Sequence, residues 1–288
     1  MHTLTTEQLN YAKNVLRKWI EKNRKDTPLL LDIKEKHIHR TADFVFKLKV
    51  EQEEAHLAEL IALLHDIAFF VSDNQPGHVE KGMDILFDKK ICKKRLIEKL
   101  IPDIKPSDDL YKIIFKAISN HGKWNVDKTD MTERESLHVD IIRDADKLDN
   151  LIYVRPGISI KKMLPHKGLR KQDLIDGKLT DKVYKSFMDR KTVDYREALT
   201  APDWWAIWAA YVFDFALPNS VELVEKSGVV KRSLDKVRFT DKQTAERFLC
   251  MRHEVDLFFD EQLPQRERKA DTEKFVTDLL NLQIHGIQ

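Results

Sequence analysis

Residues 60–70 read LIALLHDIAFF, an apolar run that holds two ionisable residues, His65 and Asp66, at its centre. Because the run is apolar on every helical face, it predicts a helix that is buried on all sides. Burying an imidazole and a carboxylate without partners costs several kcal/mol, and a bound cation would remove that cost for both groups at once. A hydrogen-bonded His–Asp pair without a metal is the alternative that this segment alone leaves open.

The rest of the chain is also typical of helices. Glycine and proline are scarce, at 8 and 9 of 288 residues, whereas β-sandwiches and β-barrels usually need more turn residues. Apolar residues recur every three or four positions along most of the chain. These patterns predict helices over residues 6–22, 29–48, 53–70, 78–87, 91–100, 107–120, 136–153, 180–190, 203–215, 220–225, 240–262 and 272–284. The predicted fold is all-α, a helical bundle with an additional C-terminal helical region.

The segment RPG at residues 155–157 interrupts the helical pattern and suggests a boundary. We expect a helical core over residues 1–155 and an accessory helical region over residues 156–288 that packs on it. The second region is either separate or part of one continuous domain. Its closely spaced aromatic residues, among them Trp204, Trp205 and Trp208, indicate core packing.

The charge balance and the cysteine content limit the classes of protein to which the chain can belong. The 50 basic and 48 acidic residues nearly balance, so the composition gives no strong nucleic-acid signal. Cys92 and Cys250 form no CxxC pair, and reduced thiols suit the cytosol. The N-terminal residues lack the apolar core of a signal peptide, and the apolar run at residues 60–71 is too short to span a bilayer. We therefore expect a cytoplasmic protein without a membrane partner, with a homo-oligomer left open.

A second segment with acidic residues on a predicted helix is DIIRDADKLDNLI, residues 140–152. Residues 141, 145, 148 and 152 form an apolar helical stripe. Asp149 lies at the edge of this stripe and Asp146 can reach inward, whereas Asp144 is expected to face outward. A solvated acidic face that pairs with Arg143 and Lys147 is the alternative interpretation.

Together with His37 in the segment HIHRT, these two segments resemble the ordered H…HD…D signature of the HD superfamily of metal-dependent phosphohydrolases. The last aspartate of that family stands in an "AD-basic-L" context, which selects Asp146 over Asp144. The resemblance covers about residues 29–153. It implies an all-helical HD domain with one divalent metal ion, bound by His37, His65, Asp66 and Asp146. Imidazole and carboxylate ligands suit Mn²⁺, Fe²⁺, Zn²⁺, Ni²⁺ or Co²⁺.

His78 and His121 decide whether a second metal is expected. In relatives with two metals, histidines in these intervals bind the second ion, and in relatives with one metal similar residues contact phosphate or act as general acid. Relatives with two metals often carry paired histidines near the second position, where this chain has only His121. The resemblance therefore favours a single metal, with a second metal at His78 and His121 as the alternative. Both residues are also compatible with solvent-facing positions at helix ends.

The resemblance implies hydrolysis of a phosphoester or phosphoanhydride bond in a nucleotide or another small phosphorylated metabolite, with a metal-activated water as nucleophile. Asp66 or Asp146 would orient or deprotonate this water, His121 and His78 would protonate the leaving oxygen, and Lys123 would contact phosphate. Further phosphate contacts are expected from Arg40, Lys147, Lys161, Lys167 and Arg170. Two alternatives stay open: a di-iron oxygenase of the same fold, which needs both extra histidines as ligands, and a ligand-sensing module with a vestigial site.

Overall fold

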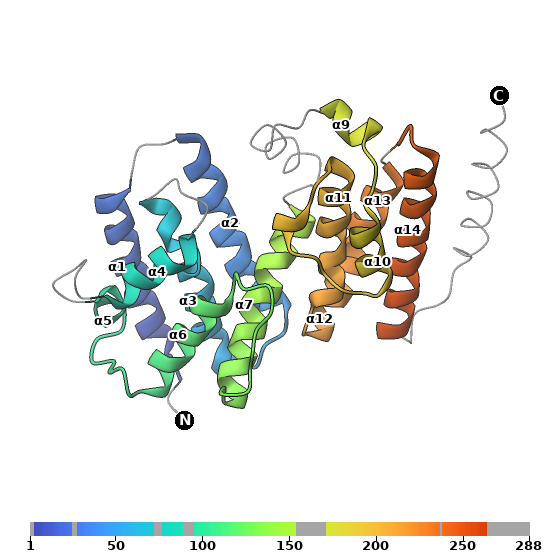
Figure 1. Ribbon diagram of the computed structural model, residues 1–288. Helices are drawn as coiled ribbons and strands as arrows, with labels where there is room; N and C mark the ends of the chain where they lie inside the picture. The colour runs from blue at the N-terminus through green and yellow to red at the C-terminus, as the bar shows by residue number, and fades with distance from the viewer. Residues whose placement is uncertain are drawn as a thin grey trace. The chain divides into compact units, whose positions relative to one another are not determined.

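The computed structural model describes residues 3–24, 28–71, 77–88, 95–153, 171–236 and 238–263. It divides the chain into two compact units, Met1–Asp149 and Asn150–Gln288 (Figure 1). The described residues are helical, with turns between the helices and no strand, which confirms the all-α prediction. The helix predicted over residues 272–284 and the loop SDNQPG, apart from Gly77, lie outside the described residues.

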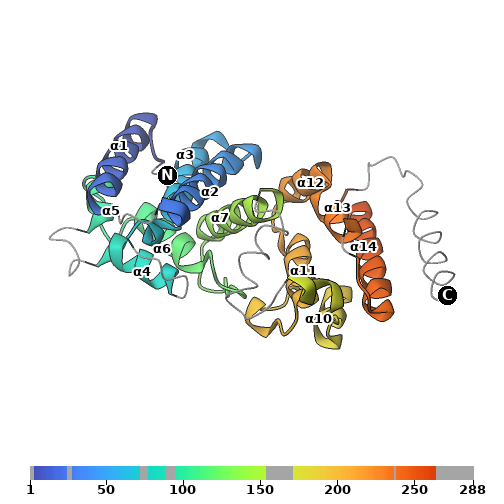
Figure 2. The same cartoon turned by 90° about the horizontal axis from the view of Figure 1, so that it is seen from above.

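The first unit is built from helices that surround the apolar run of residues 60–70. In chain order these are α1 (Thr6–Asn23), α2 (Pro28–Lys47), α3 (Gln52–Leu64), the 3-10 helix η1 (Ile67–Phe70), α4 (His78–Phe87), α5 (Leu96–Leu100), α6 (Asp109–Asn120) and α7 (Glu133–Ile152). Helices α2 and α3 lie side by side, α1 packs on α3 and α5, and α4 packs on η1 and α6 (Figure 2). Leu60, Ile61 and Leu64 are almost inaccessible to solvent, as the apolar run predicts.

Hydrogen bonds of two side chains explain why helix α1 begins where the sequence pattern predicts. The hydroxyl of Thr5 accepts a hydrogen bond from the backbone N–H of Gln8, and the Gln8 side chain accepts one from the backbone N–H of Thr5. This capping box satisfies two of the N–H groups that a helix start leaves without partners.

The helix predicted over residues 53–70 is wrong in one respect. Helix α3 ends at Leu64, and the chain continues through a turn into the 3-10 helix η1. Asp66 has left α-helical geometry, with φ −109° and ψ 24°. The apolar pattern cannot reveal this break, because residues on both sides of it are equally buried. As a consequence, the direction of the Asp66 side chain is not bound to the 100° step of an α-helix, whereas His65 keeps α-helical φ and ψ of −56° and −38°.

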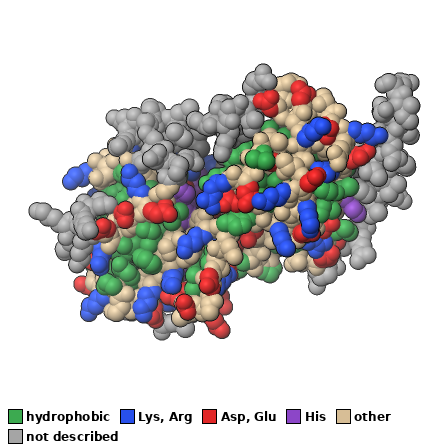
Figure 3. Space-filling model, viewed as in Figure 1, with side chains coloured by type: hydrophobic (Ala, Val, Ile, Leu, Met, Phe, Trp, Pro, Cys, Tyr) green, Lys and Arg blue, Asp and Glu red, His purple; other side chains and the backbone are tan. Residues whose placement is uncertain are grey.

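The second unit contains α9 (Lys171–Asp176), α10 (Asp181–Met188), η2 (Tyr195–Glu197), α11 (Ala201–Ala210), η3 (Tyr211–Asp214), α12 (Pro218–Ser227), α13 (Val229–Lys236) and α14 (Lys242–Gln262). The helix predicted over residues 203–215 is divided into α11 and η3, and α9 and α13 were not predicted. Trp204, Trp205 and Trp208 are buried, which agrees with core packing. None of the described helices is both long and apolar enough to cross a membrane. Basic and acidic side chains are interspersed over the face in Figure 3.

Candidate metal centre

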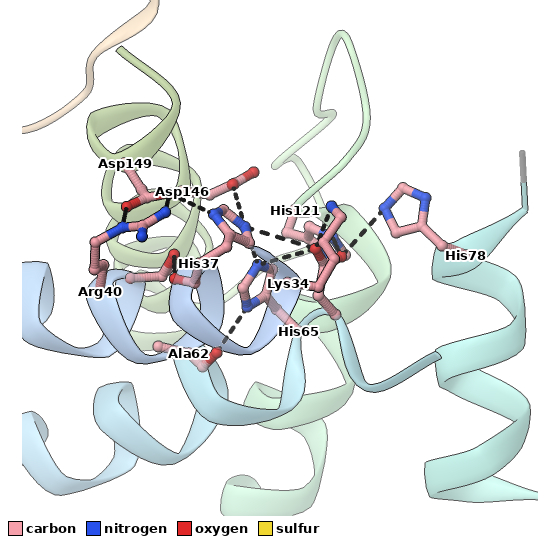
Figure 4. A network of polar contacts seen from close by, with 11 residues as sticks. Lys34, His37, Arg40, Ala62, His65, His78, His121, Asp146 and Asp149 are labelled. Atoms are coloured by element: carbon pink, nitrogen blue, oxygen red, sulfur yellow. Dashed lines mark hydrogen bonds and ion pairs between the residues drawn. The ribbon is translucent and has the colours of Figure 1, made fainter. Parts of the chain in front are cut away.

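Five segments of the first unit bring six potential metal ligands together (Figure 4). Helix α2 carries His37, the turn after α3 carries His65 and Asp66, and α7 carries Asp146. His78 is the first residue of α4, and His121 follows the last residue of α6. The donor atoms form two groups of three, each with all donor atoms within 4.8 Å of one another: His37, His65 and Asp146, and Asp66, His78 and His121.

The first group is centred on the Nε2 atom of His37. This atom lies 3.3 Å from Nε2 of His65 and 3.2 Å from Oδ1 of Asp146. Asp66 borders the group, because its Oδ2 atom lies 3.6 Å from Nε2 of His37 and 3.7 Å from Nε2 of His65. The four residues that the sequence selected as metal ligands therefore meet at one place.

The second group uses the other oxygen of the same carboxylate. Oδ1 of Asp66 lies 3.5 Å from Nε2 of His78 and 3.7 Å from Nε2 of His121. Asp66 thus presents Oδ2 to the first group and Oδ1 to the second. This is the arrangement of a carboxylate that can bridge two metal ions.

Three of the histidines are held in the tautomer that a metal ligand needs. Nδ1 of His65 donates to the carbonyl of Ala62 at 2.7 Å, and Nδ1 of His121 donates to the carbonyl of Ile118 at the same distance. Nδ1 of His37 donates to Oδ2 of Asp149 at 2.7 Å. Because carbonyl and carboxylate oxygens only accept, the proton is placed on Nδ1 and a lone pair remains on Nε2 of the neutral ring. Such outer hydrogen bonds are typical of metal-binding histidines.

The donor set fits a divalent cation. Nε2 of His121 is buried and has no hydrogen-bond partner among the described residues, and an unpaired buried polar atom is costly. With metal–ligand bonds of about 2.0–2.2 Å, ligands at right angles to each other lie about 2.8–3.1 Å apart, and ligands at wider angles lie further apart. The observed separations of 3.2 to 3.7 Å between donor atoms are compatible with this range.

The surroundings of Asp66 and Asp146 keep both carboxylates ionised. Burial alone would raise the pKa of Asp66, but Lys34 and His65 hold it well below its usual range. Burial has the same effect on Asp146, and its hydrogen bond with His37 lowers the pKa instead. Burial lowers the pKa of His65 to about 4. It acts to lower that of His37 too, but the hydrogen bonds to Asp146 and Asp149 outweigh it and raise the pKa to about 9. A metal ion that binds His37 must therefore displace a proton at neutral pH.

Asp149 orients His37, a member of the first group, by accepting the hydrogen bond from its Nδ1 atom. It is fully buried, and in addition to His37 it accepts hydrogen bonds from Nε and Nη2 of Arg40, the latter at 3.0 Å. The sequence placed Asp149 at the edge of the apolar stripe without giving it a role. Arg40 was predicted to contact phosphate, and the structure places it on Asp149, at the end of the network opposite His78 (Figure 4).

One expectation for helix α7 is wrong. Asp144 was expected to face outward, and its exposed fraction is 0%. The reason is helical spacing: Asp144 follows Ile141 by three residues and precedes Leu148 by four, so it shares the face of two residues of the apolar stripe. This signal was present in the sequence.

Of the other five predicted phosphate contacts, only Lys147 and Lys123 lie within the described residues. Lys147 is half-buried on α7, and Lys123 is exposed. The carbonyl of Lys123 accepts a hydrogen bond from Arg143. The remaining three, Lys161, Lys167 and Arg170, lie outside the described residues. The roles of all five at a phosphate stay predictions.

Two residues near the centre were not expected from the sequence. Nζ of Lys34 lies 3.3 Å from Oδ2 of Asp66. Arg143 is buried and donates from Nη1 to the carbonyls of Asn120 and His121, at 3.3 and 3.4 Å, where the chain leaves α6. Lys34 stands one helical turn before His37, a spacing that could have identified it. No local pattern relates Arg143 to His121.

Residues 35–151 match the family model of the HD domain. This segment is an HD domain. The match confirms the resemblance stated from the sequence, and the segment includes all six potential ligands as well as Asp149. HD domains bind divalent metals and define a superfamily of metal-dependent hydrolases. No curated protein and no solved structure matches the chain.

Proposed function

We propose that this HD protein hydrolyses a phosphoester or phosphoanhydride bond in a nucleotide or another small phosphorylated metabolite, with two divalent metal ions that share Asp66. The observation that carries the proposal is the division of the Asp66 carboxylate between two donor groups. In this assignment His37, His65 and Asp146 hold one ion, and His78 and His121 hold the other.

The proposal has two metal ions, whereas the sequence interpretation favoured one. A single metal was favoured because only one histidine stands near position 121. The second imidazole comes instead from His78, which reaches the same oxygen of Asp66 from a different helix, α4. His78 and His121, which were expected to protonate the leaving group, are therefore proposed as metal ligands.

The charges of the centre favour an anionic substrate. Bound metal ions would supply Lewis-acid stabilisation of a phosphoryl oxygen and a water of lowered pKa as the nucleophile. Asp66 and Asp146 cannot neutralise two divalent cations, and the charge of Asp149 is already balanced by Arg40. The residual positive charge attracts phosphate groups.

The exposure of the ligands indicates where the substrate enters. The side chains of His65, Asp66 and His121 are 1–5% exposed, whereas those of Asp146 and His78 are 22% and 29% exposed. The buried ligands exclude bulk water from the interior side of the centre. A phosphoryl group would approach on the side of His78 and Asp146.

The proposal can be tested with a screen for phosphatase and phosphodiesterase activity across nucleotides, with Mn²⁺, Ni²⁺, Co²⁺, Mg²⁺ and Zn²⁺ added in turn. Asp66→Ala should abolish activity and metal binding. Asp43→Ala, which removes an exposed carboxylate from α2, serves as the matched control and should retain both. Full activity in the Asp66 variant would refute the proposal.

A second candidate function is favoured by the same geometry. A di-iron oxygenase of this fold requires both extra histidines as ligands, and both lie at Asp66. Oxygen consumption by the iron-loaded protein, with no hydrolysis of phosphoesters under any metal, would select this alternative. A protein that retains no metal after dialysis and hydrolyses no phosphoester would instead be a sensing module.

A further inference from the structure

Lys34 supplies a cation directly at the shared carboxylate. Its Nζ atom lies 3.3 Å from Oδ2 of Asp66, the oxygen that also faces His37 and His65. Its side chain is 21% exposed, so the ammonium group is close to the ligands and still in contact with solvent. Figure 4 includes Lys34 in this network of polar contacts.

A second contact holds the ammonium group at this place without Asp66. Nζ of Lys34 lies 3.8 Å from the centre of the Phe69 ring, within the range of a cation–π interaction. The Phe69 ring is stacked on the ring of His78, with centroids 5.1 Å apart and planes at 25°. Phe69 therefore links Lys34 to the partly exposed side of the centre, where His78 lies.

A metal ion at Asp66 changes what Lys34 can bind. In the metal-free protein the ammonium group is the counter-charge of Asp66, which also lowers the pKa of that carboxylate. A divalent cation on the same carboxylate would take over this role and repel the ammonium group. Lysine has a flexible four-carbon stem and three donors, so a short movement frees it for another anion.

We propose that Lys34 binds a phosphoryl oxygen of the substrate when the metal ions are in place. This inference rests on the proposed function, because it assumes that Asp66 is a metal ligand. It adds a substrate-binding residue that lies just before the segment matched by the HD family model, residues 35–151. It also assigns a phosphate contact within the described residues, next to the exposed edge of the centre.

The test measures the binding of inorganic phosphate to the full-length, Mn²⁺-loaded protein by calorimetry, after elemental analysis has established the metal content of each variant. Lys34→Met removes the charge and keeps the apolar stem, and Lys34→Arg keeps the charge. Lys36→Met makes the same change at an exposed lysine of the same helix and serves as the control.

We expect Lys34→Met to hold the same amount of Mn²⁺ as the wild type and to bind phosphate about ten- to a hundredfold more weakly, the range for loss of a charged hydrogen bond. Lys34→Arg should retain most of the affinity, and Lys36→Met should match the wild type. Unchanged phosphate affinity in Lys34→Met would overturn the inference and leave the proposed function intact. Loss of Mn²⁺ in Lys34→Met would overturn it too, since the lysine would then support the metals. A wild-type protein that binds no metal would remove the proposed function and the inference together.

Discussion

His37 donates a 2.7 Å hydrogen bond from Nδ1 to Oδ2 of Asp149, a carboxylate with no exposed surface. The hydrogen bond fixes the ring so that Nε2 faces the candidate metal centre. Two donors of Arg40 compensate the charge of Asp149. A ligand, its orienting carboxylate and a compensating arginine therefore come from only two helices, α2 and α7.

The first prediction concerns this support. In Asp149→Asn the amide cannot satisfy both His37 and the two donors of Arg40, so we expect the limiting metal affinity of the first group at high pH, where His37 is deprotonated in both proteins, to fall about 10–100-fold, the usual effect of losing such a partner. The group with His78 and His121 should keep its ion. Titration with Mn²⁺, followed by electron paramagnetic resonance, would resolve the two sites.

Asp140→Asn provides the control for that experiment. Asp140 lies on the same helix, and its carboxylate is paired with Lys128 rather than with a histidine of the centre. This variant should bind metal as the wild type does. Equal weakening in both variants would mean that Asp149 has no specific role.

The second prediction is a pH dependence of metal binding. The pKa of His37 in the metal-free protein is raised to about 9, so the ring is protonated at neutral pH and must lose its proton before Nε2 can bind an ion. Metal affinity at the first group should rise with pH, by roughly tenfold per unit for one displaced proton, and level off above about pH 9. Competition with a chelator of known protonation behaviour measures this slope.

The same prediction has an internal control in Asp149→Asn. Removing this negative charge lowers the pKa of His37, so the rise in affinity should end at a lower pH than in the wild type. An affinity that is constant between pH 7 and 9 in the wild type would contradict the raised pKa.

The third prediction is that metal ions stabilise the first unit. A ligand that binds only the folded state at a hundred times its dissociation constant adds about 2.7 kcal/mol to the free energy of unfolding. Thermal unfolding with and without Mn²⁺ should show this shift for the wild type and for Asp43→Ala. Asp66→Ala should show none, and an equal shift in that variant would place the ion elsewhere.

The fourth prediction concerns Arg143, which holds the backbone around His121. Arg143→Met removes the side-chain donor to the carbonyls of Asn120, His121 and Lys123, although that of Asn120 keeps the backbone N–H of Lys123, so we expect a loss of about 1–3 kcal/mol in the free energy of unfolding. His121 should also lose its fixed position, so that the metal content falls from two ions towards one. Denaturant unfolding and elemental analysis measure the two effects.

Arg134→Met is the matched control for Arg143. Arg134 lies on the same helix and donates to Glu54 instead. This variant should lose stability and keep its metal content. Loss of metal in both variants would indicate that general destabilisation, and not the position of His121, removes the ion.

Much of the first unit could be predicted because its signals are local. The apolar run around His65 and Asp66 and the context of Asp146 identify an HD domain and four residues that meet in the structure. Contacts between distant segments could not be predicted in the same way. His78 and His121 approach one oxygen of Asp66 from α4 and from the end of α6, and no sequence pattern in either segment indicates that they share it.

Other details were missed for identifiable reasons. Asp144 is buried because of its spacing to Ile141 and Leu148, a pattern that was present but was outweighed by its charge. The end of α3 at Leu64 cannot be located from the pattern of hydrophobic residues, since the run stays apolar beyond it. Lys34 was overlooked because a lysine at the start of a charged segment is usually a surface residue.

The turn after Leu64 places Asp66 between the two donor groups of the centre. His37 and Asp146 depend on α2 and α7, while His78 and His121 depend on α4 and the end of α6, and the two donor triads have no member in common. Asp66, just outside the regular helix, faces both triads with its two oxygens. Loading one half should therefore alter the affinity of the other through this shared carboxylate, so that the two ions are thermodynamically linked and do not bind independently.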